Sequence, residues 1–236
     1  MADKNIVYCL CAYLSKDISL VDNIKPVIKN IKKWAHANNA DFKLITKIPD
    51  VIEDMFVSIK RSYENKETKK YSILHKKDSS KLHTLKAWNT KFEIIHDFYK
   101  SNYKKMMYFD CDILLEKNNS FNFSDYSNIF YIKKRIRKPI KNTPMVYISE
   151  KYLHKKVTGR YGLAHIFLCK EFEINLKDIF NYKELYELWL LDDHFLREEI
   201  AATYLIHKYN IQEKITQINF NFGHIGGPEA KRLFTL

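Results

Sequence analysis

The chain has 236 residues, 46% of them hydrophobic and 29% charged, and its 40 Lys and Arg outnumber its 28 Asp and Glu to give a net charge of +12. This composition is typical of a globular protein with a sizeable core and excludes an intrinsically disordered chain. No run of about 18 apolar residues is present, so we expect no membrane span. The basic excess favours a polyanionic or phosphorylated partner, either a nucleic acid or a nucleotide.

The N-terminus and the cysteines favour a cytoplasmic protein. Residues Met1 to Asn5 lead directly into an apolar segment, without the basic n-region, long apolar h-region or small-residue cleavage site of a signal peptide. The four cysteines stand in apolar segments and lack the spacing of a zinc site; they are Cys9, Cys11, Cys111 and Cys169. We therefore expect reduced cysteines that serve in packing.

Strand-like and helix-like segments alternate in the first half of the chain. Asn5–Leu14 is apolar, β-branched and aromatic, which predicts a strand, and the apolar residues of Ile18–Asn38 recur at helical spacing. Pro26, inside that helix, indicates a late start or a kink. We further expect a strand over Asp41–Thr46, a short helix over Pro49–Met55, an exposed or mobile loop over Lys60–Ser80 and a helix over Lys81–Tyr99. A strand-helix-strand unit of this kind predicts parallel pairing in an α/β sheet.

The second half is predicted to continue the same domain. We expect strands over Ile129–Ile132, Leu163–Cys169 and Ile215–Phe222, helices over Asn175–Leu191 and Asp193–Tyr209, a turn-rich connection over Asn118–Asp125 and a mobile segment over Pro139–Gly162. No internal repeat, low-complexity linker or domain break is visible, so we expect a single domain.

Two carboxylates directly follow a strongly apolar strand. Met106–Phe109 has no polar face, which predicts a central strand that is covered on both sides. Asp110 and Asp112 come next, and residues i and i+2 of an extended segment point the same way, so both carboxylates face one spot. Carboxylate oxygens at the carboxyl end of a strand suit Mg²⁺ or Mn²⁺. The alternative is that the pair only begins a turn and caps the next segment of the chain.

His224 stands in a glycine-flanked turn near the C-terminus and is a candidate third ligand. Gly223, Gly226 and Gly227 would let the backbone approach a ligand closely. An imidazole would complete a mixed oxygen and nitrogen site, which suits Mn²⁺ better than Ca²⁺. The alternative for a lone histidine is an ordinary surface or core residue.

Charged residues of two predicted helices are further candidates. Asp192 and Asp193 stand at the start of a helix, where they either stabilise its dipole or act on an acceptor hydroxyl as a base or an orienting group. Lys86 and Lys91 would reach a diphosphate held by the metal, or they lie on a solvated helix face. The dense basic run Lys133–Lys138 favours a nucleic-acid contact, but spread charge of this kind is more often a solvated surface.

The run from Lys91 to Leu114 resembles the nucleotide-sugar-dependent glycosyltransferases of the GT-A fold. The features that carry the resemblance are the lysine-bearing helix with Lys91-Phe92, the strand Tyr103-Lys104-Lys105-Met106-Met107-Tyr108-Phe109 and the Asp110-Cys111-Asp112 that follows it. The likeness is nearest to the glycogenin and lipopolysaccharide galactosyltransferase group, family 8. The tail of that group also carries a metal-binding histidine followed by glycines and a lysine.

The resemblance implies a GT-A, Rossmann-like fold with a mixed, mostly parallel sheet flanked by helices in one domain, 1–236. Residues 1–115 would form the nucleotide-sugar-binding half and residues 116–236 the acceptor-binding half. Asp110, Asp112 and His224 would hold Mn²⁺ or Mg²⁺ on the donor diphosphate. The implied donor-binding residues are Cys11, Ala12 and Tyr13 at the base and ribose, Lys91 or Lys86 at the diphosphate, and Asp110, Gly226 and Lys231; Asp192 and Asp193 fall at the acidic acceptor-site motif.

Two departures from the family concern the acceptor and the tail. The Asn-x-Gly acceptor loop is replaced by Gly162-Leu163-Ala164-His165-Ile166-Phe167, and the tail lacks the usual His-x-x-Gly-x-x-Lys-Pro-Trp ending. The sequence therefore leaves open the sugar, the stereochemistry of transfer and the acceptor, which would be a glycan, a protein or a lipid-linked group.

The leading hypothesis is a metal-dependent glycosyltransferase that moves a hexose from a nucleotide-diphosphate sugar, with a UDP-sugar favoured, to a hydroxyl acceptor. A nucleotidyltransferase acting on sugar phosphates is the first alternative, although the Cys9–Ser19 segment lacks the glycines such enzymes carry near the first strand. A basic nucleic-acid-binding protein without catalysis is the second. It leaves Asp110 and Asp112 unexplained, because carboxylates repel phosphate, so no nucleic-acid partner is expected.

Overall fold

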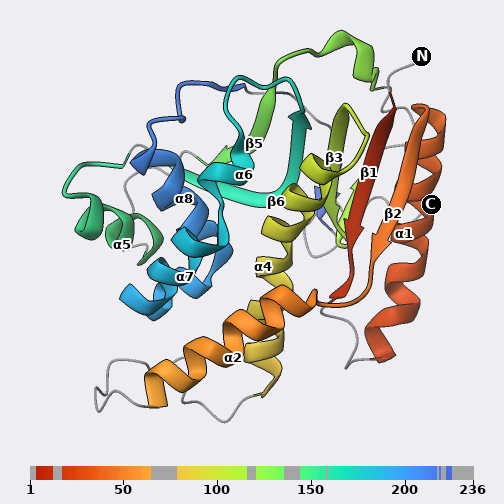
Figure 1. The fold of residues 1–236 in the computed structure, drawn as a ribbon. Coiled ribbons are helices and arrows are strands. Elements are labelled where there is room, and N and C mark those ends of the chain that lie inside the picture. The colour runs from red at the N-terminus through yellow and green to blue at the C-terminus, as the bar shows by residue number, and fades with distance from the viewer. Residues whose placement is uncertain are drawn as a thin grey trace.

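The computed structural model of the protein describes residues 4–12, 18–64, 79–115, 121–135, 144–157, 159–216, 218 and 222–224. Six strands form one sheet in the order β2-β1-β3-β6-β5-β7, and two short strands, β4 and β8, form a second sheet (Figure 1). The strands are β1 Asn5–Leu10, β2 Ala40–Ile45, β3 Lys105–Asp110, β4 Ile113–Leu115, β5 Phe130–Arg135, β6 Arg160–Cys169, β7 Ile215–Thr216 and β8 Phe222–His224.

The helices flank the large sheet and include two short 3-10 turns, η2 and η3. They are α1 Ile18–Ala37, α2 Asp50–Glu64, α4 Ser79–Lys100, η2 Phe123–Asp125, α5 Pro144–Leu153, α6 Leu176–Ile179, α7 Tyr182–Leu191, η3 Asp193–Leu196 and α8 Glu198–Lys208. None of the helices in the described part of the chain combines the length and the apolar character that crossing a membrane requires.

Five strands of the large sheet run in one direction and β6 runs against them. Strand β1 pairs in parallel with β2 and with β3, and β5 pairs in parallel with β7. Strand β6 lies antiparallel between β3 and β5. The predicted fold class, a mixed and mostly parallel sheet flanked by helices in a single domain, is therefore confirmed.

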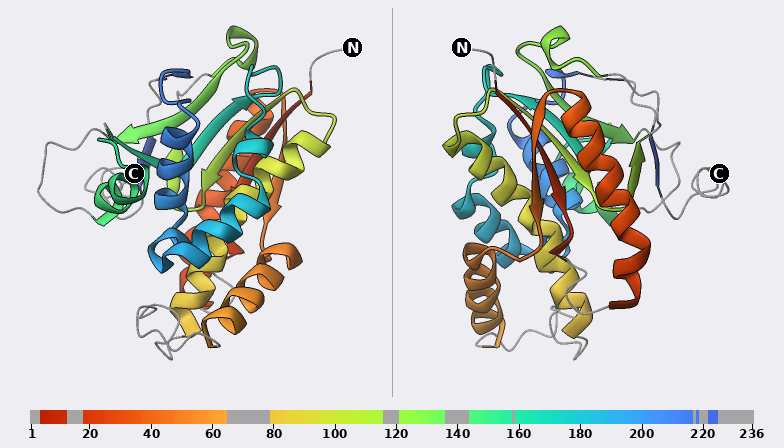
Figure 2. Two further views of the ribbon diagram at one scale, coloured as in Figure 1. Left: turned by 60° about the vertical axis from the view of Figure 1, so that its left-hand side comes forward. Right: turned by 90° about the vertical axis from the view of Figure 1, so that its right-hand side faces the viewer.

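The alternation of side chains along the central strands builds one core on each face of the sheet. Met106 and Tyr108 of β3 point to the face covered by α2, α4, α7 and α8, whereas Met107 and Phe109 point to the face covered by α1 (Figures 1 and 2). All four side chains are fully buried. The continuous apolar run of β3 thus has the two-sided burial that was predicted from it.

Several predicted segments have different limits in the structure. Strand β1 ends at Leu10, and α1 already begins at Ile18, so Pro26 neither delays the helix nor ends it. Helix α2 extends to Glu64, although the prediction for Lys60–Ser80 was a loop. It continues because Tyr63 is buried and its hydroxyl donates to the Trp189 carbonyl, a contact with α7 that local polarity does not reveal.

The second half shows three more differences. Helix α5 lies inside Pro139–Gly162, which was predicted to be mobile, because Ile148 packs into the core. The single helix predicted over Asp193–Tyr209 is divided at Arg197 into η3 and α8. The single strand predicted over Ile215–Phe222 is likewise two short strands in different sheets, since β7 pairs with β5 and β8 pairs with β4.

Candidate metal and donor site

The site is built where β1 and β3 end beside each other. The parallel register places Leu10 opposite Asp110, so the residues after each strand emerge at the same edge of the sheet. Asp110 ends β3 and Asp112 follows it, and Asp112 is exposed. Ligands of open α/β sheets bind at such an edge, because the strand ends leave room between the diverging loops. Asp110 and Asp112 therefore lie at the predicted edge of the sheet, but Cys111 and Asp112 form a turn and not the extended segment from which a common direction of the two carboxylates was predicted.

The predicted base and ribose contacts lie at the same edge but are buried. Cys11 is 5% exposed and Ala12 is 1% exposed. Nε2 of His83, on α4, lies 2.9 Å from the Ala12 carbonyl oxygen, so the backbone after β1 is held against this helix. Tyr13, the third of this predicted group, lies outside the described residues.

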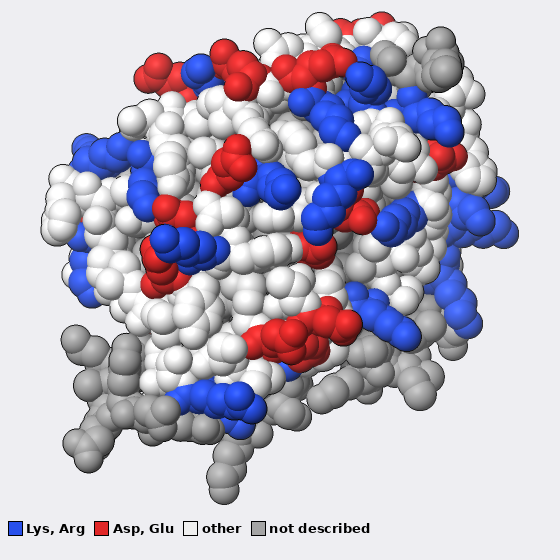
Figure 3. All heavy atoms as spheres, in the orientation of Figure 1, with Lys and Arg blue, Asp and Glu red and all other residues white. Residues whose placement is uncertain are grey.

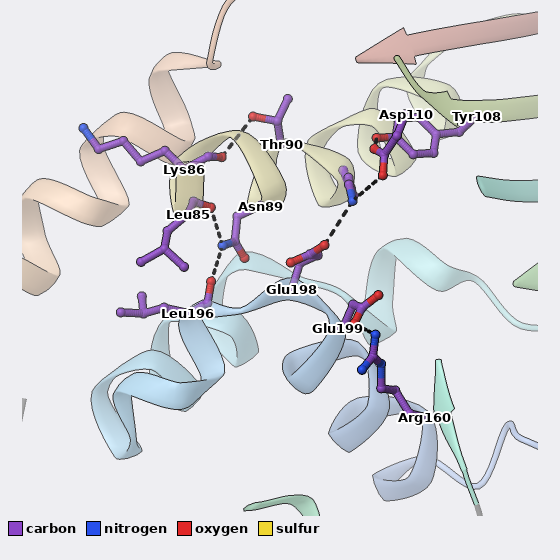
Figure 4. Close-up of polar contacts among 11 residues, drawn as sticks. Leu85, Lys86, Asn89, Thr90, Tyr108, Asp110, Arg160, Leu196, Glu198 and Glu199 are labelled. Carbon is purple, nitrogen blue, oxygen red and sulfur yellow. Dashed lines mark hydrogen bonds and ion pairs between the residues drawn. The ribbon is translucent and has the colours of Figure 1, made fainter. Parts of the chain in front are cut away.

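Lys91 lies between two carboxylates. Its Nζ is 3.2 Å from Oδ2 of Asp110 and 3.0 Å from Oε1 of Glu198, and its side chain is only 3% exposed. The Asp110 and Glu198 carboxylates approach this ammonium from β3 and from α8 (Figure 4). Burial lowers the pKa of Lys91, but the two carboxylates more than offset this and raise that pKa above its usual value. Lys91 is therefore charged.

The Asp110 carboxyl is buried and is influenced by one ammonium and by two other carboxylates. Its Oδ1 accepts a hydrogen bond from the Tyr108 hydroxyl. Burial raises the pKa of Asp110, Asp112 and Glu198 raise it further, and Lys91 and the Tyr108 hydroxyl lower it, so that the pKa is about 6. A carboxylate in this state is stabilised by an added cation. We call Lys91, Asp110, Glu198 and Tyr108 the Lys91 cluster.

The backbone of His224 lies opposite the residue that follows Asp112. Strand β8 pairs with β4 so that His224 is the register partner of Ile113, the residue after Asp112. Directly opposed residues of antiparallel strands have Cα atoms about 4.5–5.5 Å apart. The pairing of β4 with β8 therefore makes the backbone of His224 a neighbour of the turn that carries Asp112. Gly226 and Lys231, the other predicted tail residues, lie outside the described residues.

The two candidate lysines of α4 have different partners. Lys86 pairs with Glu53 of α2, whereas Lys91 contacts Asp110. Five residues on a helix correspond to well over one turn, so the two side chains leave α4 on different sides. The geometry favours Lys91 as the lysine of the metal and donor site. In this conformation its ammonium is buried against the Asp110 and Glu198 carboxylates.

Asp192 and Asp193 precede a 3-10 turn and not the long helix that was predicted. Asp192 caps η3, since its Oδ1 accepts from the backbone N–H of His194 at 3.0 Å. The same Oδ1 lies 2.7 Å from Nδ1 of His194, and its Oδ2 accepts from the Tyr152 hydroxyl at 2.9 Å. Burial raises the pKa of Asp192, but the hydrogen bonds from His194 and Tyr152 outweigh it and lower that pKa.

Asp192, Asp193, His194 and Tyr152 are called the Asp192 cluster below. Asp193 is 4% exposed and its Oδ1 lies 3.3 Å from the same His194 nitrogen, while the His194 side chain is 42% exposed. One oxygen or nitrogen atom from each of Asp192, Asp193 and His194 lies within 4.8 Å of the others. His194 was not predicted as a site residue. Its position beside two predicted aspartates was the available signal.

Glu198 is the other residue that sequence reasoning missed. It is 5% exposed, in the first turn of a helix whose residues Ile200 to Thr203 are all buried. A helix that is apolar on every side is buried, so a carboxylate within it needs a partner. That pattern was visible in the sequence, but the identity of the partner was not. The neighbouring Glu199 pairs instead with Arg160 of β6, at 2.6 Å (Figure 4).

The face of the protein shown in Figure 3 carries charges of both signs side by side. Among the described residues on that face, Lys and Arg alternate with Asp and Glu and form no continuous basic area. A nucleic-acid groove requires such an area, because binding depends on neutralising successive phosphates.

No protein-family model matches the chain, and no curated protein matches it significantly. Among solved structures, it is similar to a glycosyltransferase involved in the glycosylation of the major capsid of PBCV-1, with 10% identity, a TM-score of 0.45 and 100% of both chains covered. It is also similar to apo mouse xyloside xylosyltransferase 1, with 10% identity, a TM-score of 0.49, and 92% of this chain and 85% of that chain covered. Both TM-scores lie below 0.5, so the fold class rests on the sheet itself.

Proposed function

We propose that the protein is a metal-dependent glycosyltransferase of the GT-A type. It would move a hexose from a nucleotide-diphosphate sugar, with a UDP-sugar favoured, to a hydroxyl of a glycan, protein or lipid-linked acceptor. The observation that carries the proposal is the ammonium of Lys91 held against Asp110, at the edge of the sheet where β1 and β3 end. Residues 1–115 supply most of this donor side and residues 116–236 the acceptor side.

The donor set fits a hard divalent cation. The Lys91 ammonium has two carboxylate partners, Asp110 and Glu198, and Asp112 acts electrostatically on Asp110. Asp110 and Asp112 would hold Mn²⁺ or Mg²⁺ together with His224. A cation bound there supplies charge neutralisation on the departing nucleoside diphosphate. Cys11 and Ala12 would lie beside the base and ribose at the end of β1, although both residues are buried in this conformation.

The Asp192 cluster supports an acceptor-side role for Asp192 and Asp193. With Nδ1 of His194 protonated, the ring donates to Asp192 and leaves Nε2 to accept a proton from a hydroxyl. In this arrangement Asp192 and Asp193 orient the imidazole, and His194 would meet the acceptor. The half-exposed position of the ring suits contact with an incoming substrate.

The test is a panel of nucleotide sugars, with and without Mn²⁺, followed by thermal melting and by the release of nucleoside diphosphate. A donor at a hundred times its dissociation constant should add about 2.7 kcal/mol of stability. Asp112→Asn should lose the Mn²⁺-dependent part of this shift. Asp54→Asn, a change of the same chemistry at an exposed position of α2, should keep it.

Three other outcomes would contradict the proposal. Release of pyrophosphate from a nucleoside triphosphate and a sugar phosphate would show the alternative nucleotidyltransferase. Stabilisation by oligonucleotides but by no nucleotide sugar would show a nucleic-acid-binding protein. A donor-induced rise in melting temperature that is the same with and without Mn²⁺, and the same in Asp112→Asn, would show that donor binding does not depend on the metal.

A further inference from the structure

The buried ammonium of Lys91 has two carboxylate acceptors at similar distances, 3.2 Å to Asp110 and 3.0 Å to Glu198. One positive charge cannot neutralise both carboxylates. If Glu198 were uncharged, Asp110 would be the only charged partner of Lys91, and the Asp110 carboxylate would attract a cation less strongly. Glu198 therefore controls how much negative charge Asp110 presents at the edge of the sheet.

Asp110 and Glu198 leave an excess of negative charge beside Lys91. The two carboxylates share this one ammonium, so one negative charge is in excess within the buried group of three side chains. Glu198 also acts on Asp110 electrostatically and raises its pKa. The next residue, Glu199, pairs with Arg160.

The position of Glu198 is fixed by a contact between α4 and the segment before α8. The side-chain amide of Asn89 donates to the carbonyl of Leu85 at 2.8 Å and to that of Leu196 at 2.7 Å (Figure 4). Asn89 precedes Lys91 by two residues and Leu196 precedes Glu198 by two. The same contact therefore aligns the two helices so that Glu198 stands opposite Lys91.

We propose that Glu198 is a positioning residue of the metal site: it takes up part of the Lys91 charge, so that Asp110 stays available to a divalent cation. The inference rests on the metal site of the proposed function, and it adds a residue outside the three predicted ligands. Glu198 acts through Lys91 and touches neither the cation nor the donor.

The experiment measures the affinity of the purified protein for Mn²⁺ alone, from the electron paramagnetic resonance signal of the free ion. Glu198→Gln keeps the size and hydrogen-bonding capacity of the side chain and removes its charge, and it should weaken Mn²⁺ binding roughly tenfold or more. Glu198→Asp keeps the charge and should bind more tightly than Glu198→Gln. Glu199→Gln is the matched control, because it removes a carboxylate one residue away that pairs with Arg160, and it should change the affinity less than about twofold.

A double variant separates charge from structure. Lys91→Met with Glu198→Gln removes one positive and one negative charge and leaves the excess unchanged, so its Mn²⁺ affinity should return to within about threefold of the wild type. A purely structural role for Glu198 predicts the opposite, because the double variant loses more contacts than either single change. If Glu198→Gln does not fold, the double variant carries the test by the same threefold criterion.

The results separate this inference from the proposed function. Equal Mn²⁺ affinity in the wild type and Glu198→Gln, or a tenfold loss in the double variant, overturns the role of Glu198 even if sugar transfer is observed. A wild type that binds no Mn²⁺ overturns it as well. The protein could also show the predicted order of Mn²⁺ affinities and yet transfer no sugar. That result would support the role of Glu198 and contradict only the proposed function.

Discussion

The Lys91 cluster and the Asp192 cluster use the same kinds of side chain in opposite ways. The partners of Lys91 come from β3 and α8, and the contact with Glu198 joins residues 107 positions apart. The closest contacts of Asp192 are with His194, two residues on, although Tyr152 reaches it from α5. One cluster is buried and assembled by the fold, whereas the other is largely local and has a half-exposed imidazole.

This difference in burial indicates which charged residues contribute most to the stability of the fold. A buried ion pair is costly to break, because the charge that remains is neither paired nor solvated. An exposed charge that loses its partner is still solvated by water, so the cost is small. We therefore expect large stability effects in the Lys91 cluster and small ones in the Asp192 cluster. The Asp192 cluster is accordingly freer to face a substrate.

Lys91→Met should have the largest effect. It leaves Asp110 and Glu198 buried without their counter-charge, so the free energy of unfolding should fall by about 3–5 kcal/mol in urea denaturation. Lys43→Met is the control, since Lys43 pairs with Asp97 with both side chains well exposed, and it should cost less than about 1 kcal/mol. An equal loss of unfolding free energy in the two variants would contradict the expected difference between buried and exposed ion pairs.

Asn89→Ala should have the next largest effect, because it removes the hydrogen bond from α4 to the Leu196 carbonyl of η3, together with one to Leu85 within α4. We expect a loss of about 2 kcal/mol in unfolding free energy, since the Leu196 carbonyl is left without its donor. Thr90→Ala, at an equally buried position of the same helix, removes only a bond within α4 and should cost less than about 1 kcal/mol. A larger loss in Thr90→Ala would show that the contact between the helices adds little.

Asp192→Ala should cost about 1 kcal/mol, which is the usual value for losing the cap of a helical turn. Asp192→Asn keeps an oxygen for the His194 backbone N–H and should recover most of this stability. Both variants should lose turnover if Asp192 orients His194 through its charge. Chemical denaturation and donor turnover, measured on the same samples, separate the two effects, and a loss above about 3 kcal/mol would place Asp192 with the buried cluster.

His96 provides the smallest test, a buried contact outside both clusters. Its Nε2 lies 2.9 Å from the Phe180 carbonyl oxygen, and burial lowers the pKa of the imidazole below its ordinary value of 6.5. The unfolded chain therefore takes up a proton at this residue before the folded protein does, so stability is lost as the pH falls below about 6.5.

His96→Gln should remove that contribution. Between pH 7 and pH 5.5, the unfolding free energy of the wild type should fall by on the order of 1 kcal/mol more than that of the variant. His36→Gln, at an exposed position of α1, is the control for the loss of one imidazole. Parallel stability curves for the wild type and His96→Gln would contradict the assignment.

The sequence by itself determined the central features of the fold and the place of the site. The apolar run of β3 has no polar face, so it predicted a strand buried on both sides, and Asp110 and Asp112 follow it at the sheet edge as expected. The helical spacing of Leu85, Phe92 and Ile95 predicted α4 for the same reason. These patterns are local, so a single stretch of sequence contains them.

Only the tertiary structure decided which charges meet. Lys91 was one of two equivalent lysines on a predicted helix until the fold placed Asp110 and Glu198 around it and Glu53 beside Lys86. The division of Asp193–Tyr209 into η3 and α8 also depends on packing, because Asp192 caps the short turn and Asn89 holds Leu196 from another helix. Contacts between residues about a hundred positions apart leave no periodic signal, so the partner of a buried charge is set by the fold.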